Sequence, residues 1–502
     1  MALTSMEFLI LVGIAVAGYY LIPKKYQWMW LLGFSYLYYV SGGVKLLGYL
    51  LFTTLTTYGA GIFLEKTEEK GRRKGILILT LVLNFGVLAV LKYLNFVLLN
   101  INRIFQGDIS FVNFTLPLGI SFYTFQSMGY LLDVYWKRGK AEKNPFRFAL
   151  FVAFFPQLLQ GPIGRFSRLG EQLYAPHSWE WKRMEEAFER ILWGFFKKMV
   201  VADTAAIFVN ALFDEYQTYP GLAVFAALAY SVQLYGDFSG GIDVVIGISK
   251  LFGITLDENF KRPYFARSIT DFWHRWHITL GTWMKDYIFY PVSLSGWMGR
   301  FGKMAKKAFG RSVGRTLPIC LANLIVFLVV GVWHGAAWKF IVYGLYNGMI
   351  IAFSGLMAGN YRKWKKKLHI QDKSWGWQVF QILRTFLLVN ISWFFDRADS
   401  VGQALAMMKN SVTHWKPSQL LTIPVGHGGT TAYTGLSLAI LAVGILILFI
   451  FGILEERGMD VFSRIARMPV WFRMGLYLAV IFAIPMVGQP PSSTGGFIYA
   501  QF

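Results

Sequence analysis

The chain has 502 residues, of which 55% are hydrophobic and 18% aromatic, and its mean hydropathy is +0.45. These values lie outside the range of soluble globular proteins, so the sequence indicates a membrane protein. The formal net charge of +22 comes from short basic clusters between apolar runs. That pattern is typical of membrane topology signals and argues against nucleic-acid binding.

Long apolar runs recur along the whole chain, and each approaches or exceeds the roughly 20 residues that a helix needs to cross the hydrocarbon core. They must be helical, because a lipid-exposed strand edge leaves backbone groups unpaired. The sequence therefore predicts an all-α polytopic membrane protein. The first run lacks a basic start and a clear cleavage site, so we interpret it as a retained span. The runs cover residues 6–22, 44–64, 76–98, 316–332, 337–358, 377–395 and 433–453.

Basic clusters mark the loops that we expect on the cytoplasmic side, because positive charge favours that side. With these loops inside and the poorly basic linkers at 41–45 and 100–115 outside, the N-terminus is predicted to lie outside. A further crossing at 471–487 places the C-terminal tail outside as well. The span from Thr316 then runs outward and carries His334 toward its outer end, and residues 148–300 contribute an even number of crossings. The clusters lie at 65–74, 137–147, 300–315 and 361–369.

The segment 255–295 is too charged for a lipid-facing helix, yet it is rich in aromatic residues. This mixture favours amphipathic or re-entrant helices that are buried against protein or line a polar cavity. On a helix, Asp271, His274 and Arg275 fall three and four positions apart and share one face, while Trp273 and His277 share another.

The two histidines of this segment, His274 and His277, have a spacing that suits a metal site. No HExxH motif or nearby cysteine set completes such a site, so we expect no bound metal. An ion-pair network that anchors a helix at the membrane interface is the alternative reading of His274 and Asp271.

Two carboxylates, Asp237 and Asp243, lie in the weakly polar stretch "LYGDFSGGIDVVIGISKLFG". Carboxylates at membrane depth suggest function, although helix packing through small residues explains the glycines equally well. The chain has no P-loop, no GxGxxG after a strand and no GxSxG elbow, which disfavours nucleotide-driven transport and serine hydrolase chemistry.

His334 follows Trp333 at the end of an apolar run and precedes Gly335. A neutral imidazole takes a proton from a hydroxyl as that hydroxyl attacks an ester or thioester, and burial keeps the ring neutral. Gly335 lets the backbone approach a substrate closely. Taken alone, a histidine near the aromatic belt is more often structural.

The chain ends in "GQPPSSTGGFIYAQF", a linker at 488–496 followed by an aromatic tail. We predict one membrane domain over residues 1–487 and an extracytoplasmic tail over 488–502. Aromatic tails commonly dock at the interface. The F-x-Y-x-x-F pattern around Tyr499 also resembles the C-terminal motif of small partner peptides in teichoic acid D-alanylation, whose tyrosine is implicated in carrying the acyl group.

Several stretches together resemble the membrane-bound O-acyltransferase family, and within it the bacterial branch typified by the alginate O-acetylation membrane protein. They appear in the family's order and cover most of the chain. Two departures stand out: His274 where arginine is common, and Ala500 within the tail. The stretches are "PLGISFYTFQ" (117–126), "FFPQLLQGPIGR" (154–165), "YGDFSGGIDVVIG" (235–247), "NFKRPYFARSITDFWHRWHITLGTWMKDYIFYPV" (259–292), "GVWHGAAW" (331–338), "WFFDRA" (393–398) and "FIYAQF" (497–502).

The resemblance implies a helical bundle around a funnel or tunnel through the membrane. His334 matches the family's catalytic histidine, and His277 matches the second recurring one. Tyr499 is a candidate acyl relay. We take Trp333, Asp237, Asn259 and His274 as candidate substrate-binding residues.

The function that follows is acyl transfer, most simply of acetyl, in the bacterial cytoplasmic (inner) membrane. The donor is a cytoplasmic thioester, acetyl-CoA or an acyl carrier protein, that acts as co-substrate, and we expect no bound cofactor. The acceptor is a hydroxyl outside, reached through an extracytoplasmic partner of the SGNH hydrolase type, for O-acylation of an extracellular or cell-wall polysaccharide. Two alternatives are D-alanyl transfer to teichoic acid from a carrier protein, and a transporter or flippase without acyl chemistry.

Overall fold

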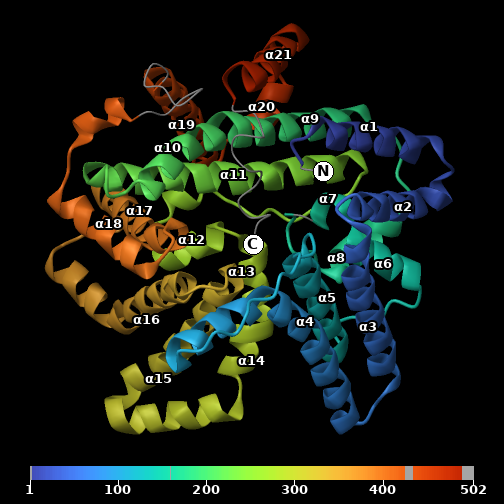
Figure 1. Ribbon diagram of the computed structural model, residues 1–502, viewed down its shortest axis with the longest axis horizontal. Helices are drawn as coiled ribbons and strands as arrows, with labels where there is room; N and C mark the ends of the chain where they lie inside the picture. Colours follow the sequence, from blue (N-terminus) through green and yellow to red (C-terminus); the bar gives the residue numbers. More distant parts are fainter. Residues whose placement is uncertain (1–2, 159, 424–433, 489–502) are drawn as a thin grey trace. The chain divides into compact units, whose positions relative to one another are not determined.

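The computed structural model describes residues 3–158, 160–423 and 434–488. These residues form helices joined by loops (Figure 1), and extended pairing within them is limited to one isolated antiparallel bridge between Phe260 and Trp276. The helical fold class expected from the apolar runs is therefore confirmed. The tail at 489–502, including Tyr499, lies outside the described residues.

Seven helices among the described residues are long and apolar enough to cross a membrane, which makes the protein a multi-pass membrane protein. They match six of the seven expected runs and the further crossing expected at 471–487. The segments are Val44–Lys66, which contains α3 (Leu47–Lys66), α4 (Lys70–Phe105), α15 (Gly296–His334), α16 (Trp338–Lys367), α17 (Trp375–Arg397), α19 (Thr434–Glu456) and α21 (Val470–Val487).

The first expected run forms α1 (Met6–Leu21), an apolar helix of 16 residues. A helix of this length measures about 24 Å, which is less than the thickness of the hydrocarbon core, roughly 30 Å. It is also shorter than the seven candidate spans. A retained first span therefore stays a prediction, as does the placement of both termini outside.

The middle of the chain folds as short or buried helices. None of the candidate spans found among the described residues lies between Phe105 and Gly296. Segment 255–295, for which the sequence favours amphipathic or re-entrant helices, forms α12 (Ile269–Arg275) and then α13 (Ile278–Met284), which continues through a π-helix (Lys285–Phe289) into α14 (Tyr290–Ser293). This confirms that the charged, aromatic segment avoids a lipid-facing span.

Contacts divide the chain into two compact units, each built from segments that are distant in the sequence. The first unit comprises Met1–Val200, Gly236–Glu258 and Phe462–Phe502. The second unit comprises Val201–Tyr235 and Asn259–Val461. A single domain over residues 1–487 stays a prediction.

In the first unit, α3, α4 and α5 (Ile120–Tyr135) run side by side (Figure 1). A buried arginine of α4, Arg73, joins the three helix ends. Its guanidinium donates hydrogen bonds to the backbone carbonyls of Thr67 at 3.0 Å and Tyr135 at 2.7 Å. A buried charge is thus accommodated by backbone acceptors, as a low-dielectric interior requires.

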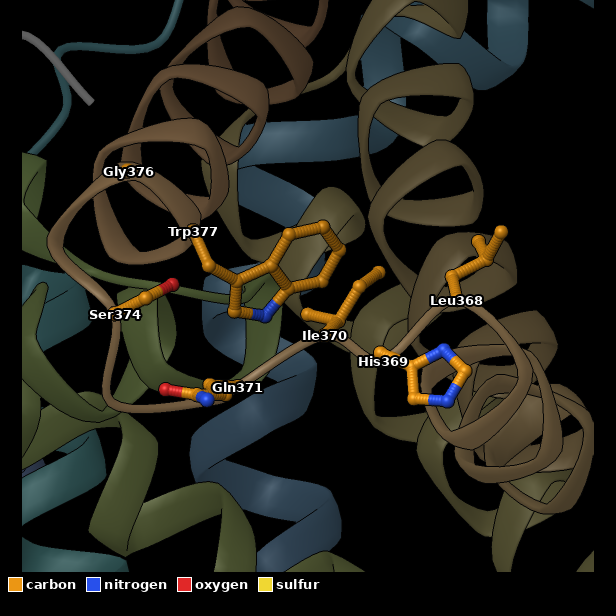
Figure 2. A pocket seen from close by; sticks show the side chains of 7 residues that line it. All are labelled: Leu368, His369, Ile370, Gln371, Ser374, Gly376 and Trp377. Carbon is orange, nitrogen blue, oxygen red and sulfur yellow. The ribbon is translucent and has the colours of Figure 1, made fainter.

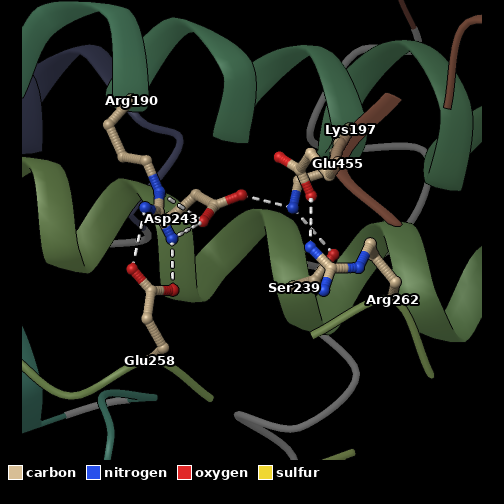
Figure 3. A network of polar contacts seen from close by, with 7 residues as sticks. All are labelled: Arg190, Lys197, Ser239, Asp243, Glu258, Arg262 and Glu455. Carbon is tan, nitrogen blue, oxygen red and sulfur yellow. Dashed lines mark hydrogen bonds and ion pairs between the residues drawn. The ribbon is translucent and has the colours of Figure 1, made fainter. Parts of the chain in front are cut away.

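The first unit also buries a network of charges, part of which is drawn in Figure 3. α9 (Trp181–Phe195) continues into a π-helix (Phe196–Ala202), and both pack on the part of α11 (Ala223–Leu251) that belongs to this unit. Arg190 contacts Asp243 at 2.6 Å and also binds Glu258 at 2.7 Å. Lys197 pairs with the same Asp243.

A second buried pair of the first unit joins Lys198 and Asp237 at 2.6 Å, with side chains only 3% and 1% exposed. The two lysines are consecutive on the π-helix, and each reaches its own carboxylate on α11. The helices approach closely because Gly194 faces Gly240: a Cβ on Gly194 would lie 2.6 Å from the Gly240 carbonyl oxygen. The two carboxylates noted in the sequence therefore each have a lysine partner.

We predict that Asp237→Asn destabilises the protein strongly, because it removes the counter-charge of a buried lysine. The expected cost is about 3–5 kcal/mol of unfolding free energy. The midpoint of thermal unfolding in detergent, followed by size-exclusion chromatography, measures it. Replacing both partners, by Lys198→Met with Asp237→Leu, should recover most of the loss.

The matched control is Asp257→Asn. Asp257 contacts Arg168 at 2.7 Å, but those side chains are 32% and 60% exposed. Exposed pairs contribute about 0–1 kcal/mol, so this variant should unfold close to the parent protein. If Asp237→Asn and Asp257→Asn lowered the midpoint of thermal unfolding equally, the loss of a buried counter-charge to Lys198 would cost no more stability than the loss of an exposed one.

Candidate active site

His334 is the last residue of α15 and is 2% exposed. The close packing of α15 against α16 fixes its backbone. A Cβ added at Gly331 would lie 2.4 Å from the carbonyl oxygen of Phe340, and one added at Gly344 would lie 2.3 Å from that of Phe327. Only glycine permits this separation, so the two backbones touch one turn before the histidine.

Gly335 was expected to admit a substrate. Its φ of 174° is extended and needs no glycine. A Cβ there would lie 2.3 Å from the ring of Phe340. Packing within the chain thus accounts for the glycine, and the Phe340 ring occupies the space that it leaves.

A buried carboxylate faces the imidazole of His334. Asp396, near the end of α17, has its Oδ1 3.6 Å from His334 Nδ1, and the two side chains are 2% and 3% exposed. The hydroxyl of Tyr230, on α11, donates a hydrogen bond of 2.6 Å to Asp396 Oδ2. The ammonium group of Lys339 donates to the backbone carbonyls of Asp396 at 3.2 Å and Ala398 at 2.6 Å. All of these groups belong to the second unit.

Sequence reasoning gave no role to Asp396 or Tyr230. The signal for Asp396 was present, since it directly follows the apolar run 377–395 within the quoted stretch "WFFDRA". An acidic residue at such a position is a functional hypothesis by default. Tyr230 carries no comparable signal, because its role depends on how α11 packs.

Aromatic rings surround the imidazole of His334. The centroid of Tyr343 lies 5.0 Å from it, and that of Trp333 lies 5.3 Å away. Tyr343 in turn stacks on Trp393 at 6.0 Å. Such rings leave the imidazole little freedom, so its orientation is set before any substrate arrives.

His277 lies in the turn between α12 and α13, with a left-handed φ of 48°. Asn259 holds this turn: its side-chain oxygen accepts hydrogen bonds from the Thr279 amide and hydroxyl, both at 3.0 Å, and lies 3.3 Å from His277 Nδ1. The expectation that Trp273 and His277 share one face of a continuous helix is therefore wrong. The helix ends at Arg275 because Asn259 draws the chain into a turn.

The ring of Trp333 contacts both histidines, with its centroid 5.6 Å from that of His277 and 5.3 Å from that of His334. Burial, together with the neighbouring His334, lowers the pKa of His277 well below its ordinary value. His277 is thus neutral near pH 7. It enters the site as an uncharged imidazole.

The charged face of α12 takes part in an ion-pair network of the second unit. Arg275 contacts Asp271 at 2.9 Å and Glu456 at 3.1 Å, and Arg262 contacts the same Glu456 at 2.8 Å. Figure 3 includes the neighbouring pair of Arg262 with Glu455. Asp271 therefore belongs to an ion-pair network, as the alternative reading supposed, and the anchoring of a helix at the membrane interface by this network stays a prediction.

The sequence-derived candidates separate into three groups. His334, Trp333 and His277 come together, and Asn259 holds the turn of His277. His274 is exposed on α12, and Asp237 is buried against Lys198 in the first unit. No group of three or more His, Cys, Asp or Glu side chains with metal-binding geometry occurs among the residues that the structure describes.

The geometry at His334 suits general base catalysis. A carboxylate beside Nδ1 favours the proton on that nitrogen and leaves Nε2 as the basic one. The carboxylate also compensates the charge that the ring acquires when Nε2 takes a proton. The hydrogen bond from Tyr230 keeps Asp396 oriented toward the ring.

Comparison with known proteins agrees with this chemistry. Residues 142–305 match the model of the membrane-bound O-acyltransferase (MBOAT) family. The chain is 34% identical to "Probable alginate O-acetylase AlgI" of Pseudomonas syringae pv. tomato, over 87% of this chain and 78% of that protein. It is 34% identical to the "Peptidoglycan O-acetyltransferase" of Helicobacter pylori, over 78% and 74%.

A weaker similarity links the chain to the "Teichoic acid D-alanyltransferase" of Bacillus subtilis, with 27% identity over 54% of this chain and 66% of that protein. The O-acetylating relatives are both more similar and more completely covered. From these similarities and the seven apolar helices, the chain belongs to the membrane-bound O-acyltransferase family and is a membrane-embedded acyltransferase.

Proposed function

We propose that the protein transfers an acetyl group from a cytoplasmic thioester to a hydroxyl acceptor, for O-acylation of an extracellular or cell-wall polysaccharide. The observation that carries the proposal is the buried pair of His334 and Asp396, a base with its orienting carboxylate. The printed functions of the relatives, alginate O-acetylase and peptidoglycan O-acetyltransferase, supply the acyl group and the acceptor class.

In the proposed step, Nε2 of His334 removes the proton from the acceptor hydroxyl. The hydroxyl oxygen attacks the thioester carbonyl carbon and forms a tetrahedral intermediate. The carbon–sulfur bond then breaks, and the leaving thiolate takes the proton back from His334. Asp396 stabilises the imidazolium while it holds the proton, as in other histidine bases oriented by a carboxylate.

His277 contributes a neutral imidazole in contact with Trp333. We assign it the role of orienting or binding the donor, and Asn259 the role of holding the turn that presents it. Trp333 contacts both rings and is the best placed of the candidate substrate-binding residues. Roles for His274 and Asp237 in substrate binding stay predictions.

The donor in this proposal is acetyl-CoA or an acyl carrier protein, used as co-substrate with no resident cofactor. The enzyme resides in the bacterial inner membrane with both termini outside and works with an extracytoplasmic SGNH-type partner. Teichoic acid D-alanylation is the second candidate, since a D-alanyltransferase is among the relatives at 27% identity. A transporter without chemistry gives no account of the His334–Asp396 pair.

We predict that His334→Ala abolishes acyl transfer, while the protein still inserts and purifies. Loss of a positioned base costs about 10² to 10⁴ in rate. Transfer of a radiolabelled acetyl group to polymer measures the effect. Near-normal transfer by the variant would contradict the proposed role of the imidazole.

We predict that Asp396→Asn lowers the transfer rate by up to about 10⁴, because the amide keeps the shape but neither favours the right tautomer nor compensates the imidazolium. The same radiolabel assay measures it. Asp399→Asn is the matched control, since Asp399 is exposed three positions further along. Equal activity of the two variants would remove Asp396 from the mechanism.

The C-terminal tail supports a relay, which we propose as part of the same function. Its residues 489–502 lie outside those that the structure describes, and the topology rule predicts the tail on the same side of the membrane as the outer end of the span that carries His334. In the relay, the Tyr499 hydroxyl gives its proton to His334 and attacks the thioester, the carbon–sulfur bond breaks, and the thiolate leaves with that proton. A hydroxyl of the partner then attacks the tyrosyl ester and takes the acyl group, and its proton restores the Tyr499 hydroxyl. Tethering provides a high effective concentration of this first acceptor.

We predict that Tyr499→Phe stops transfer to the polymer and leaves donor binding intact, because it removes one oxygen and keeps the ring. Mass spectrometry of trapped wild-type protein should find the acyl mass on the C-terminal peptide. Full polymer acylation by the variant would reduce the tail to a docking element. The His334–Asp396 chemistry would then stand without a relay.

A further inference from the structure

A pocket unrelated to the residues of the candidate active site opens at the loop between α16 and α17, in the second unit (Figure 2). It is an open depression of about 420 Å³ at the surface of the protein. The residues that line it come from the end of α16, the loop and the first turn of α17: Leu368, His369, Ile370, Gln371, Ser374, Gly376 and Trp377.

The surroundings of this pocket are strongly basic. Asp372, the acidic residue of the stretch 361–377, is paired with Lys365 at 2.5 Å. The other positive charges of this stretch therefore have no acidic partner within it, and they favour the binding of an anion. The basic residues of the stretch are Arg362, Lys363, Lys365, Lys366, Lys367 and Lys373.

Hydrogen-bond donors line the same pocket. The indole Nε1 of Trp377 is buried and has no hydrogen-bond partner. In Figure 2 it lies on the edge of the ring that faces Ile370 and Gln371. The ring is held in place by Phe380, stacked at 5.1 Å, and by the Lys365 ammonium group at 5.7 Å. A buried N–H of this kind costs free energy unless a ligand supplies an acceptor.

The first turn of α17 adds backbone donors. Ser374 is its N-cap residue, but its side chain makes no capping hydrogen bond. Ser374, Gly376 and Trp377 line the pocket, so the positive end of a 23-residue helix borders it. Helix N-termini of this kind favour phosphate and carboxylate groups.

The position of the loop identifies the source of the anion. It joins two helices that are long and apolar enough to cross a membrane, so we expect it at the membrane interface. Three large side chains around it are exposed: Trp364 at 51%, Leu368 at 66% and Trp375 at 81%. Tryptophan is enriched at the headgroup level of bilayers, and basic clusters next to a span attract anionic lipids.

We propose that this pocket binds the phosphate of an anionic phospholipid headgroup. The Trp377 indole and the first turn of α17 donate hydrogen bonds to the phosphate. Lys367 and Lys373 flank the lining residues in the sequence and supply the charge. Trp364 and Trp375 lie in the surrounding headgroup layer. The inference is independent of the acyl-transfer chemistry at His334.

Native mass spectrometry of the full-length protein in detergent tests the proposal, with palmitoyl-oleoyl phosphatidylglycerol as the probe and the matching phosphatidylcholine as comparison. We expect tighter binding of phosphatidylglycerol. Trp377→Phe, which removes the N–H and keeps an aromatic ring, should weaken its binding about tenfold. The double variant Lys367→Gln with Lys373→Gln should do the same without touching the ring.

The matched control is Lys303→Gln with Lys307→Gln, which removes two exposed charges from the basic segment 300–315. It should bind the lipid as the parent protein does. Equal weakening by both double variants would mean diffuse surface attraction and would overturn the site. Equal binding of phosphatidylcholine would also overturn it.

Coenzyme A added as competitor separates the two sources of phosphate. If coenzyme A displaced the lipid from the parent protein but not from Trp377→Phe, that result would assign the pocket to a soluble donor and overturn the lipid assignment. If Trp377→Phe does not elute as a folded protein, the lysine double variant decides the question alone.

Discussion

A carboxylate buried beside an imidazole is the interaction on which the candidate site depends. Alone in such a dry interior, an ionised Asp396 would be costly, and so would His334 once it takes a proton, since an unpaired buried charge is unfavourable. Together, and with the Tyr230 hydroxyl on the second oxygen, they form a group that accepts a proton at low electrostatic cost. The three residues come from α15, α17 and α11, so the site exists only after these helices have packed.

The two units use buried polarity in different ways. In the first unit, lysines and aspartates on the π-helix and α11 compensate one another, which leaves little reactivity. In the second unit, His277 is uncharged and His334 is paired with a single carboxylate. A compensated network specifies helix register, whereas a polarised imidazole remains able to exchange a proton.

The sequence predicted the spanning helices well, because an apolar run of membrane length has few alternatives to a helix in lipid. The pair of Asp271 with Arg275 was also predictable, since four residues of helix set that contact. Local patterns carried both of these predictions.

What the sequence could not predict are the contacts between distant segments. The turn at His277 depends on Asn259, eighteen positions away, and that side chain ends a helix that the local pattern would have continued. Asp396 and Tyr230 meet across 166 positions of sequence. Predicting which lysines pair with Asp237 and Asp243 would have required the knowledge that Phe196–Ala202 form a π-helix. The sequence shows no pattern from which we could predict that π-helix.

The contact of Gly331 with Gly344 determines how rigidly the histidine is held. At this point α15 and α16 meet backbone to backbone, with no side chain between them that changes rotamer. Side-chain contacts adjust over several tenths of an ångström, but two peptide backbones at van der Waals distance do not compress. The hairpin therefore acts as a fixed mechanical stop one turn before His334. The backbone position of His334 is therefore set by this contact between two main chains and not by the rotamers of interhelical side chains.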